Sequence, residues 1–257
     1  MSPGDVPVLL VRASRRLARE VGGLSFGRPV GWVYNPLIYA RRPHEAYLQR
    51  YAATHKRVVL VGMNPGPWGM AQTGVPFGAI SMVSGWLGIR EPVRPFAGAH
   101  PRVPVTGFDC ARSEVSGMRL WGFMRDTYGT PEAMAAELFV ANYCPLLFLD
   151  DDGRNLTPDR INRRDQPPLF AACDRHLRAV VEALRPEWLV GVGLFAEGRA
   201  RSVVEEAGSA IKVTSILHPS PANPRSQKDW PGQVAAALRA AGVWGPAAER
   251  PDRWKKR

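Results

Sequence analysis

Residues 62–78, GMNPGPWGMAQTGVPFG, decide how the rest of the chain is interpreted. They follow residues 57–61, a short apolar run rich in β-branched side chains that is typical of a strand buried on both faces. In open α/β sheets, ligands bind just outside the carboxyl ends of such strands, where a glycine-rich turn lets backbone N–H groups approach closely. One polar side chain, Asn64, stands at the mouth of this loop. Because the loop has neither a GxGxxG nor a GxxxxGK[ST] pattern, we expect it to hold something other than a nucleotide phosphate.

Strands and helices are predicted to alternate along the remainder of the chain. Further strands are expected at residues 138–143, 188–193 and 211–217, and helices at residues 8–21, 43–53, 79–87, 113–129, 168–184 and 194–207. Residues 91–110 and 150–168 read as loops. This alternation predicts an α/β fold with a central parallel four-stranded sheet flanked by helices. We expect a single domain over residues 1–257, with its core at about 30–242 and loose ends at roughly 1–25 and 245–257.

Two further polar side chains stand at the carboxyl ends of expected strands. Asn142 falls at the end of one strand, and His218 follows another directly, before a proline-rich loop. Parallel strands would bring both beside Asn64. Taken singly, a buried asparagine often only satisfies backbone groups, and a histidine here is often structural. His176, on the helix expected at 168–184, is given a solvated structural role.

The composition favours a polyanionic partner. The 257 residues include 34 Lys and Arg against 23 Asp and Glu, a net charge of +11. Such a surplus suits nucleic acid, because neutralising phosphates releases condensed counterions. A genome rich in G and C, which favours arginine everywhere, would explain the same surplus.

The three cysteines argue against a metal centre. Cys110, Cys144 and Cys173 lie far apart without CxxC or Cys/His spacing, so we expect no iron–sulfur cluster, no structural zinc and no cofactor. Free thiols suit a reducing cytosol. No run approaches 18 apolar residues, and no signal peptide is recognisable. We therefore expect a cytoplasmic monomer that is not bound to a membrane.

Five motifs together resemble one known family. The 62–78 run, SEVSGMRLWGF at 113–123, NYCPLLFL at 142–149, GRNLTP at 153–158 and HPSPANP at 218–224 are similar to those of the single-strand-selective monofunctional uracil-DNA glycosylases, of the uracil-DNA glycosylase superfamily. The resemblance covers roughly residues 30–242 and indicates a bacterial-type member, nucleoid-associated if the source is bacterial. It implies a three-layer α/β/α fold with strand order 2-1-3-4. It also implies an enzyme that flips uracil and oxidised uracils, such as 5-hydroxymethyluracil, out of single- and double-stranded DNA and hydrolyses the N-glycosidic bond.

The resemblance also implies a role for each candidate residue. His218 would donate to the uracil O2, and Asn64 would position the attacking water. The amide of Asn142 would match the O4 and N3–H edge of uracil and reject cytosine, which presents the reverse pattern. The base would also contact Met63, Gly66 and Phe77. DNA contacts are expected from Ser113, Ser116, Arg119, Pro219, Ser220, Pro221, Ala222, Asn223, Arg225 and Lys228.

Departures from the family and competing interpretations stay open. Vertebrate relatives carry arginine at the place of Ala222, so the residue that enters the duplex is not identified, and Arg225 is a candidate. A mismatch-specific thymine/uracil glycosylase also has an Asn-Pro-Gly core, and a catalytically idle DNA-binding relative is a third interpretation. The sequence does not rank uracil, 5-hydroxymethyluracil, 5-formyluracil and xanthine as substrates, nor single- against double-stranded DNA.

Overall fold

A four-stranded parallel sheet forms the centre of the molecule. We describe residues 5–245 of a computed structural model of the chain. The sheet contains β2 (Val58–Gly62), β3 (Leu138–Asn142), β6 (Trp188–Val192) and β7 (Lys212–Ile216), in the order β3-β2-β6-β7. Every neighbouring pair is parallel. Numbered within this sheet alone, the order is the predicted 2-1-3-4.

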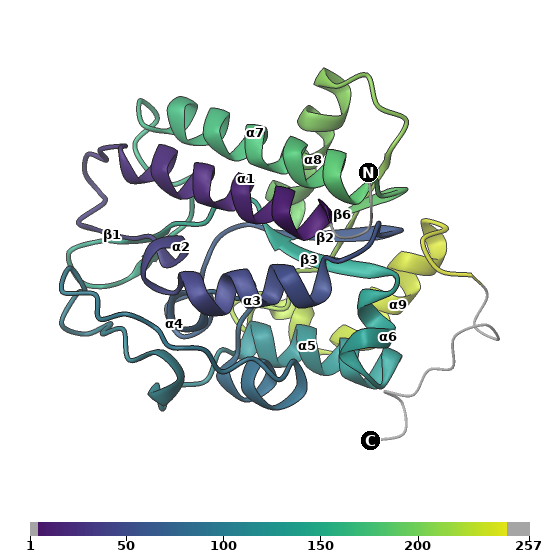
Figure 1. Ribbon diagram of the computed structural model, residues 1–257, viewed down its shortest axis with the longest axis horizontal. Helices are drawn as coiled ribbons and strands as arrows, with labels where there is room; N and C mark the ends of the chain where they lie inside the picture. The colour runs from purple at the N-terminus through teal and green to yellow at the C-terminus, as the bar shows by residue number, and fades with distance from the viewer. Residues whose placement is uncertain (1–4, 246–257) are drawn as a thin grey trace.

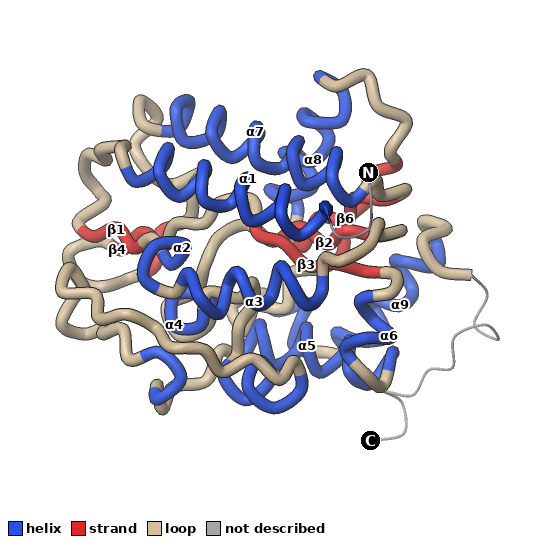
Figure 2. Tube along the Cα trace, viewed as in Figure 1, coloured by secondary structure: helices blue, strands red, loops and turns tan. Residues whose placement is uncertain are grey.

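Helices cover both faces of the sheet. In Figures 1 and 2, α1 and α7 lie above it and α5, α6 and α9 lie below it, which gives the three predicted layers. The helices, with their bounds, are α1 (Asp5–Gly22), α2 (Pro36–Tyr39), α3 (Arg41–Tyr51), α4 (Met70–Thr73), α5 (Val115–Tyr128), α6 (Pro131–Ala135), α7 (Gln166–Leu184), α8 (Leu194–Glu206) and α9 (Trp230–Ala240). Short 3₁₀ turns lie at η2 (Gly107–Asp109) and η3 (Pro224–Gln227).

Burial explains why β2, β3 and β6 were recognisable as strands. All five residues of β2 and of β6 are buried, because helices cover both faces. Most of the buried apolar side chains form one cluster that runs from Val6 to Trp244, and a smaller cluster contains Tyr34 and Leu147. The single domain stays a prediction. No helix within residues 5–245 combines the length and apolar character needed to cross a bilayer.

The expectation of a loose N-terminal segment is wrong for residues 5–22. They form α1, whose Val6, Leu10, Leu17 and Val21 are almost completely buried. The apolar residues recur on one helical face and pack against α7, so the segment belongs to the core. The other expected loose end, from residue 246 onward, lies outside the described residues.

The expected helix at residues 79–87 is instead mainly a wider turn, η1 (Met82–Trp86). Its backbone bond from Leu87 N to Met82 O, 2.8 Å long, spans five residues and is characteristic of a π-helix. Ser84 Oγ donates to Ile80 O at 2.7 Å, so a side chain competes for a carbonyl that a regular helix would use.

A second, small sheet was not predicted. It contains β1 (Trp32–Tyr34), β4 (Leu147–Leu149) and β5 (Asn155–Leu156), in the order β1-β4-β5 and antiparallel throughout. Strands of two or three residues are too short to show a period. The expected loop at 150–168 therefore contains β5, and α7 begins within it, with prolines tolerated in its first turn.

Candidate active site

A pocket of about 490 Å³ opens at the carboxyl end of the parallel sheet. The strand ends β2, β3 and β7 supply Asn64, Asn142 and His218 to its wall. It is lined by Met63, Asn64, Gly66, Pro67, Trp68, Met70, Phe77, Ser113, Glu114, Val115, Ser116, Asn142, Asn155, Thr157, His218, Ser220 and Pro221. The structure thus brings together both expected catalytic residues and all four expected base contacts.

The glycine-rich loop is held rigidly against a neighbouring loop. Gln72 is fully buried, and its amide Nε2 donates to Pro67 O and Pro104 O, each at 3.0 Å. Its Oε1 accepts from Thr106 N at 2.9 Å and Gly107 N at 3.1 Å. A buried amide with all four bonds made fixes the backbone on both sides of it.

Asn64 is oriented by two backbone carbonyls. Its Nδ2 donates to Leu146 O at 3.2 Å, in the segment just after β3, and to Pro65 O at 3.5 Å. These bonds use the two N–H donors of the amide and leave Oδ1 as an acceptor in the pocket. An acceptor at this place can hold a water molecule, but an amide cannot remove a proton from it.

Asn142 lies beside the glycine-rich loop because its strand pairs with β2. The register places Asn142 opposite Gly62, and an added Cβ at Gly62 would lie only 2.3 Å from Asn142 Oδ1. Asn142 Nδ2 approaches Met70 Sδ at 3.3 Å, a weak acceptor, and Oδ1 is buried without a hydrogen-bond partner among the described residues. A buried unpaired amide oxygen in a pocket is suited to a ligand N–H.

Phe77 is held in an unusual backbone conformation. Its φ of +52° lies in the left-handed region, which phenylalanine rarely adopts. Its carbonyl accepts from Ala79 N at 2.7 Å, and Gly117 of α5 approaches so closely that an added Cβ would lie 2.0 Å from that oxygen. The ring lies 6.0 Å from the His218 ring, centroid to centroid, and forms an apolar wall of the pocket.

His218 is neutral and has one defined tautomer. Burial lowers its pKa to about 4, so the imidazole carries no charge near pH 7. Nδ1 accepts a hydrogen bond from Ser220 N at 3.1 Å, so the ring proton must be on Nε2. The residue is therefore a neutral donor.

Arg119 holds the loop after His218 through hydrogen bonds. The guanidinium donates to Pro219 O at 3.0 Å, Ser226 Oγ at 3.1 Å and Gln227 Oε1 at 3.2 Å. These bonds use three of the five N–H donors of the guanidinium, and the expected contact of Arg119 with DNA stays a prediction. We propose that Arg119 also positions the loop.

The other expected DNA contacts are divided between the pocket and its rim. Ser113, Ser116, Ser220 and Pro221 line the pocket. Three residues of the loop are exposed: Ala222, Arg225 and Lys228. Asn223 is half-buried, and its side chain accepts a hydrogen bond from Arg225 N at 3.1 Å, whereas Pro219 is buried. The N-cap of α5 is Glu114, which lies between the two serines and whose side chain accepts from Ser116 N.

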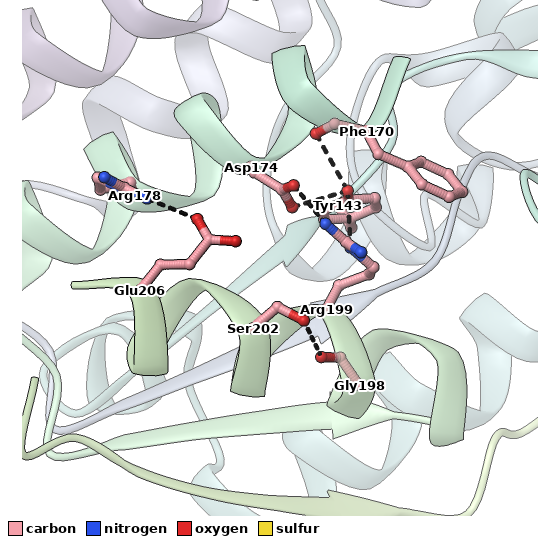
Figure 3. A network of polar contacts seen from close by, with 8 residues as sticks. All are labelled: Tyr143, Phe170, Asp174, Arg178, Gly198, Arg199, Ser202 and Glu206. Carbon is pink, nitrogen blue, oxygen red and sulfur yellow. Dashed lines mark hydrogen bonds and ion pairs between the residues drawn. The ribbon is translucent and has the colours of Figure 1, made fainter. Parts of the chain in front are cut away.

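A polar network around Tyr143, the residue that follows β3, includes Asp174 and Arg199 (Figure 3). Tyr143 donates to Asp174 Oδ1 at 2.8 Å, and Arg199 Nε donates to the Tyr143 hydroxyl at 3.0 Å. Arg199 also forms an ion pair with Asp174 and stacks over Phe170. The network ties α7 and α8 to the residue that follows Asn142, which fixes the strand end.

Sequence reasoning missed seven lining residues and misjudged one histidine. The seven all lie in the quoted motifs, but no chemistry was assigned to them: Pro67, Trp68, Met70, Glu114, Val115, Asn155 and Thr157. His176, expected to be solvated, is half-buried, and burial of its ring lowers its pKa to about 4. Within residues 5–245, no group of three His, Cys, Asp or Glu side chains is arranged to hold a metal ion.

Comparison with known proteins identifies the family. Residues 49–241 match the uracil DNA glycosylase superfamily. The chain is 43% identical over 242 residues to the single-strand selective monofunctional uracil DNA glycosylase of Bos taurus, covering 94% of this chain and 89% of that protein. With its counterpart from Mus musculus it is 44% identical over 228 residues, 89% of this chain and 82% of that one.

A solved structure shares the fold. The crystal structure of Pedobacter heparinus SMUG2 superposes with a TM-score of 0.64 at 15% identity, covering 90% of this chain and 99% of that one. With the sequence match over most of its length, the chain belongs to the single-strand selective monofunctional uracil-DNA glycosylases of the uracil DNA glycosylase superfamily.

Proposed function

We propose that this protein removes uracil from DNA by hydrolysing its N-glycosidic bond, as a monofunctional uracil-DNA glycosylase in base excision repair. Family membership supports the activity. The observation that carries the mechanism is the convergence of Asn64, Asn142 and His218 at three strand ends around one pocket. A catalytically idle relative would have no need to keep all three.

Base recognition follows from the pocket walls. Asn142 Oδ1 accepts from the uracil N3–H, and its Nδ2 turns from the weak Met70 sulfur acceptor to O4. The Phe77 ring stacks on the flipped base. Cytosine has an unprotonated N3 and an amino group at C4, so it leaves the same amide unpaired and is rejected.

Catalysis depends on stabilising the departing base. Breaking the bond leaves negative charge on uracil, and the neutral Nε2–H of His218 donates to O2 as that charge develops. Asn64 Oδ1 holds the water that attacks C1′. The residues lining the pocket in the described part of the chain include no lysine, in keeping with a simple hydrolysis that leaves an abasic site and an intact strand.

The finer specificity is also part of the proposal. Gly66 has no side chain that would block a C5 substituent, which supports excision of oxidised uracils such as 5-hydroxymethyluracil and little release of thymine. We propose action on both single- and double-stranded DNA, by a cytoplasmic monomer. The thymine/uracil mismatch alternative rests on the Asn-Pro-Gly core at residues 64–66, whereas the sequence match over most of the chain favours the single-strand selective family.

Product analysis tests the proposal. An oligonucleotide with one uracil, incubated with the protein, should release free uracil and keep an intact backbone that alkali then cleaves at the abasic site. A matched oligonucleotide with cytosine should release nothing. Strand cleavage without alkali would contradict monofunctional hydrolysis, and release of cytosine would contradict the role given to Asn142.

A further inference from the structure

Glu114 is an acidic side chain of the pocket to which the mechanism above gives no role. It is the N-cap of α5, and Oε1 accepts from Ser116 N at 3.3 Å. Serine, threonine, aspartate and asparagine are the residues preferred at this position. Helix capping alone therefore does not explain the longer side chain.

Two glycines of the 62–78 loop make room for this side chain. An added Cβ at Gly66 would lie 2.4 Å from Glu114 Oε2, and one at Gly69 would lie 2.8 Å from Glu114 Cγ. Both distances are far shorter than van der Waals contact. The carboxyl group of Glu114 therefore forms the pocket wall at Gly66.

The carboxyl group lacks a compensating charge. Glu114 takes part in none of the ion pairs formed within residues 5–245, although the chain carries a net charge of +11. Burial raises its pKa above the ordinary glutamate value. A buried carboxyl group without a positive partner lowers the stability of the fold. Its place in a pocket indicates that it binds a ligand.

In the proposed pose of uracil, one edge of the base remains to contact the pocket wall that Glu114 forms. Asn142 meets N3–H and O4, His218 meets O2, and Asn64 lies toward the sugar, so the C5–C6 edge faces Gly66 and Glu114. We infer that Glu114 determines which C5 substituents the enzyme accepts, by accepting a hydrogen bond from a hydroxyl group on that substituent. A methyl group would desolvate the carboxyl group without replacing its hydrogen bonds, so thymine is disfavoured. This inference rests on the proposed function.

Glu114→Asp separates this role from capping. Aspartate is a preferred N-cap, so the helix keeps its start, but the shorter side chain withdraws the carboxyl group from Gly66. Glu114→Ala removes both functions. Glu132→Gln is the matched control, because Glu132 is an exposed glutamate in the first turn of α6 outside the pocket.

The measurement is single-turnover release from single-stranded oligonucleotides that differ only in the target base: uracil, 5-hydroxymethyluracil or thymine. Glu114→Asp and Glu114→Ala should each lower the ratio of 5-hydroxymethyluracil to uracil rates about tenfold, the size of one hydrogen bond to a charged group. Uracil rates should stay within about threefold of wild type, and the control should match wild type.

Two outcomes overturn the inference. An unchanged ratio in Glu114→Asp means that the residue only caps the helix. An equal fall for both substrates means that it serves catalysis or folding, not C5 recognition. A wild-type protein that releases no uracil would instead refute the proposed function itself, which keeps the two failures distinct.

Discussion

Lowering the pH tests whether His218 works as a buried neutral donor. An exposed histidine with a pKa near 6.5 would be about 90% protonated at pH 5.5. With its pKa lowered to about 4, His218 is only about 3% protonated at that pH. We therefore expect the single-turnover rate of folded enzyme to stay flat from pH 8 to about 5.5 and to fall only toward pH 4.

Stability should respond to pH earlier than activity. The unfolded imidazole takes up a proton near pH 6.5, whereas the folded one does so only near pH 4, so acid favours unfolding across that window. Burial of the rings of His44 and His176 lowers their pKa values in the same direction. The free energy of unfolding should thus have its full value above pH 6.5 and decrease as the pH falls from 6.5 to 4.

The assay follows uracil release and circular dichroism at each pH, so that rates refer to folded protein. His218→Gln is the control, because its amide donates but does not titrate. That variant should be slower but equally flat, and its stability should fall less with acid. A wild-type rate that halves near pH 6.5, with no such step in His218→Gln, would refute the reasoning.

Two further predictions concern the parts that position the site. Gly117→Ala should lower activity at least tenfold, because the added Cβ would lie 2.0 Å from the Phe77 carbonyl oxygen. Gly122→Ala in the same helix is the control, because its added Cβ meets nothing within 4 Å, and it should preserve activity. Equal activity of the two variants in the release assay would contradict the role of the close approach at Gly117. Arg225→Ala should weaken activity on duplex more than on single strands, because only the duplex must be held open, while Arg119→Ala should impair both by loosening the loop. Equal losses for Arg225→Ala, with a shallower salt dependence, would make Arg225 a phosphate contact.

The sequence predicted the central sheet because its strands carry a strong local signal. The strands are short, mostly apolar runs, and β2 and β6 are completely buried. The meeting of Asn64, Asn142 and His218 then followed from parallel pairing alone, and the observed register confirms that Asn142 lies opposite Gly62. The family resemblance added the strand order, which the structure confirms.

Other features depend on contacts between distant segments, which no local pattern reveals. Glu114 lies against Gly66 and Gly69 only because α5 docks on the glycine-rich loop. The bonds from Arg119 to the loop after β7 span about 100 residues. The strands β1, β4 and β5 are stabilised by one another and are too short to show a period.

The central claim is that the pocket at the carboxyl end of the sheet removes uracil through Asn64 and His218. The most direct test measures DNA affinity and single-turnover uracil release for wild type, Asn64→Ala and His218→Ala on one single-stranded oligonucleotide. We predict unchanged affinity with release slowed on the order of 10²- to 10³-fold in His218→Ala, and a large loss in Asn64→Ala. Wild-type release rates in either variant would contradict the claim.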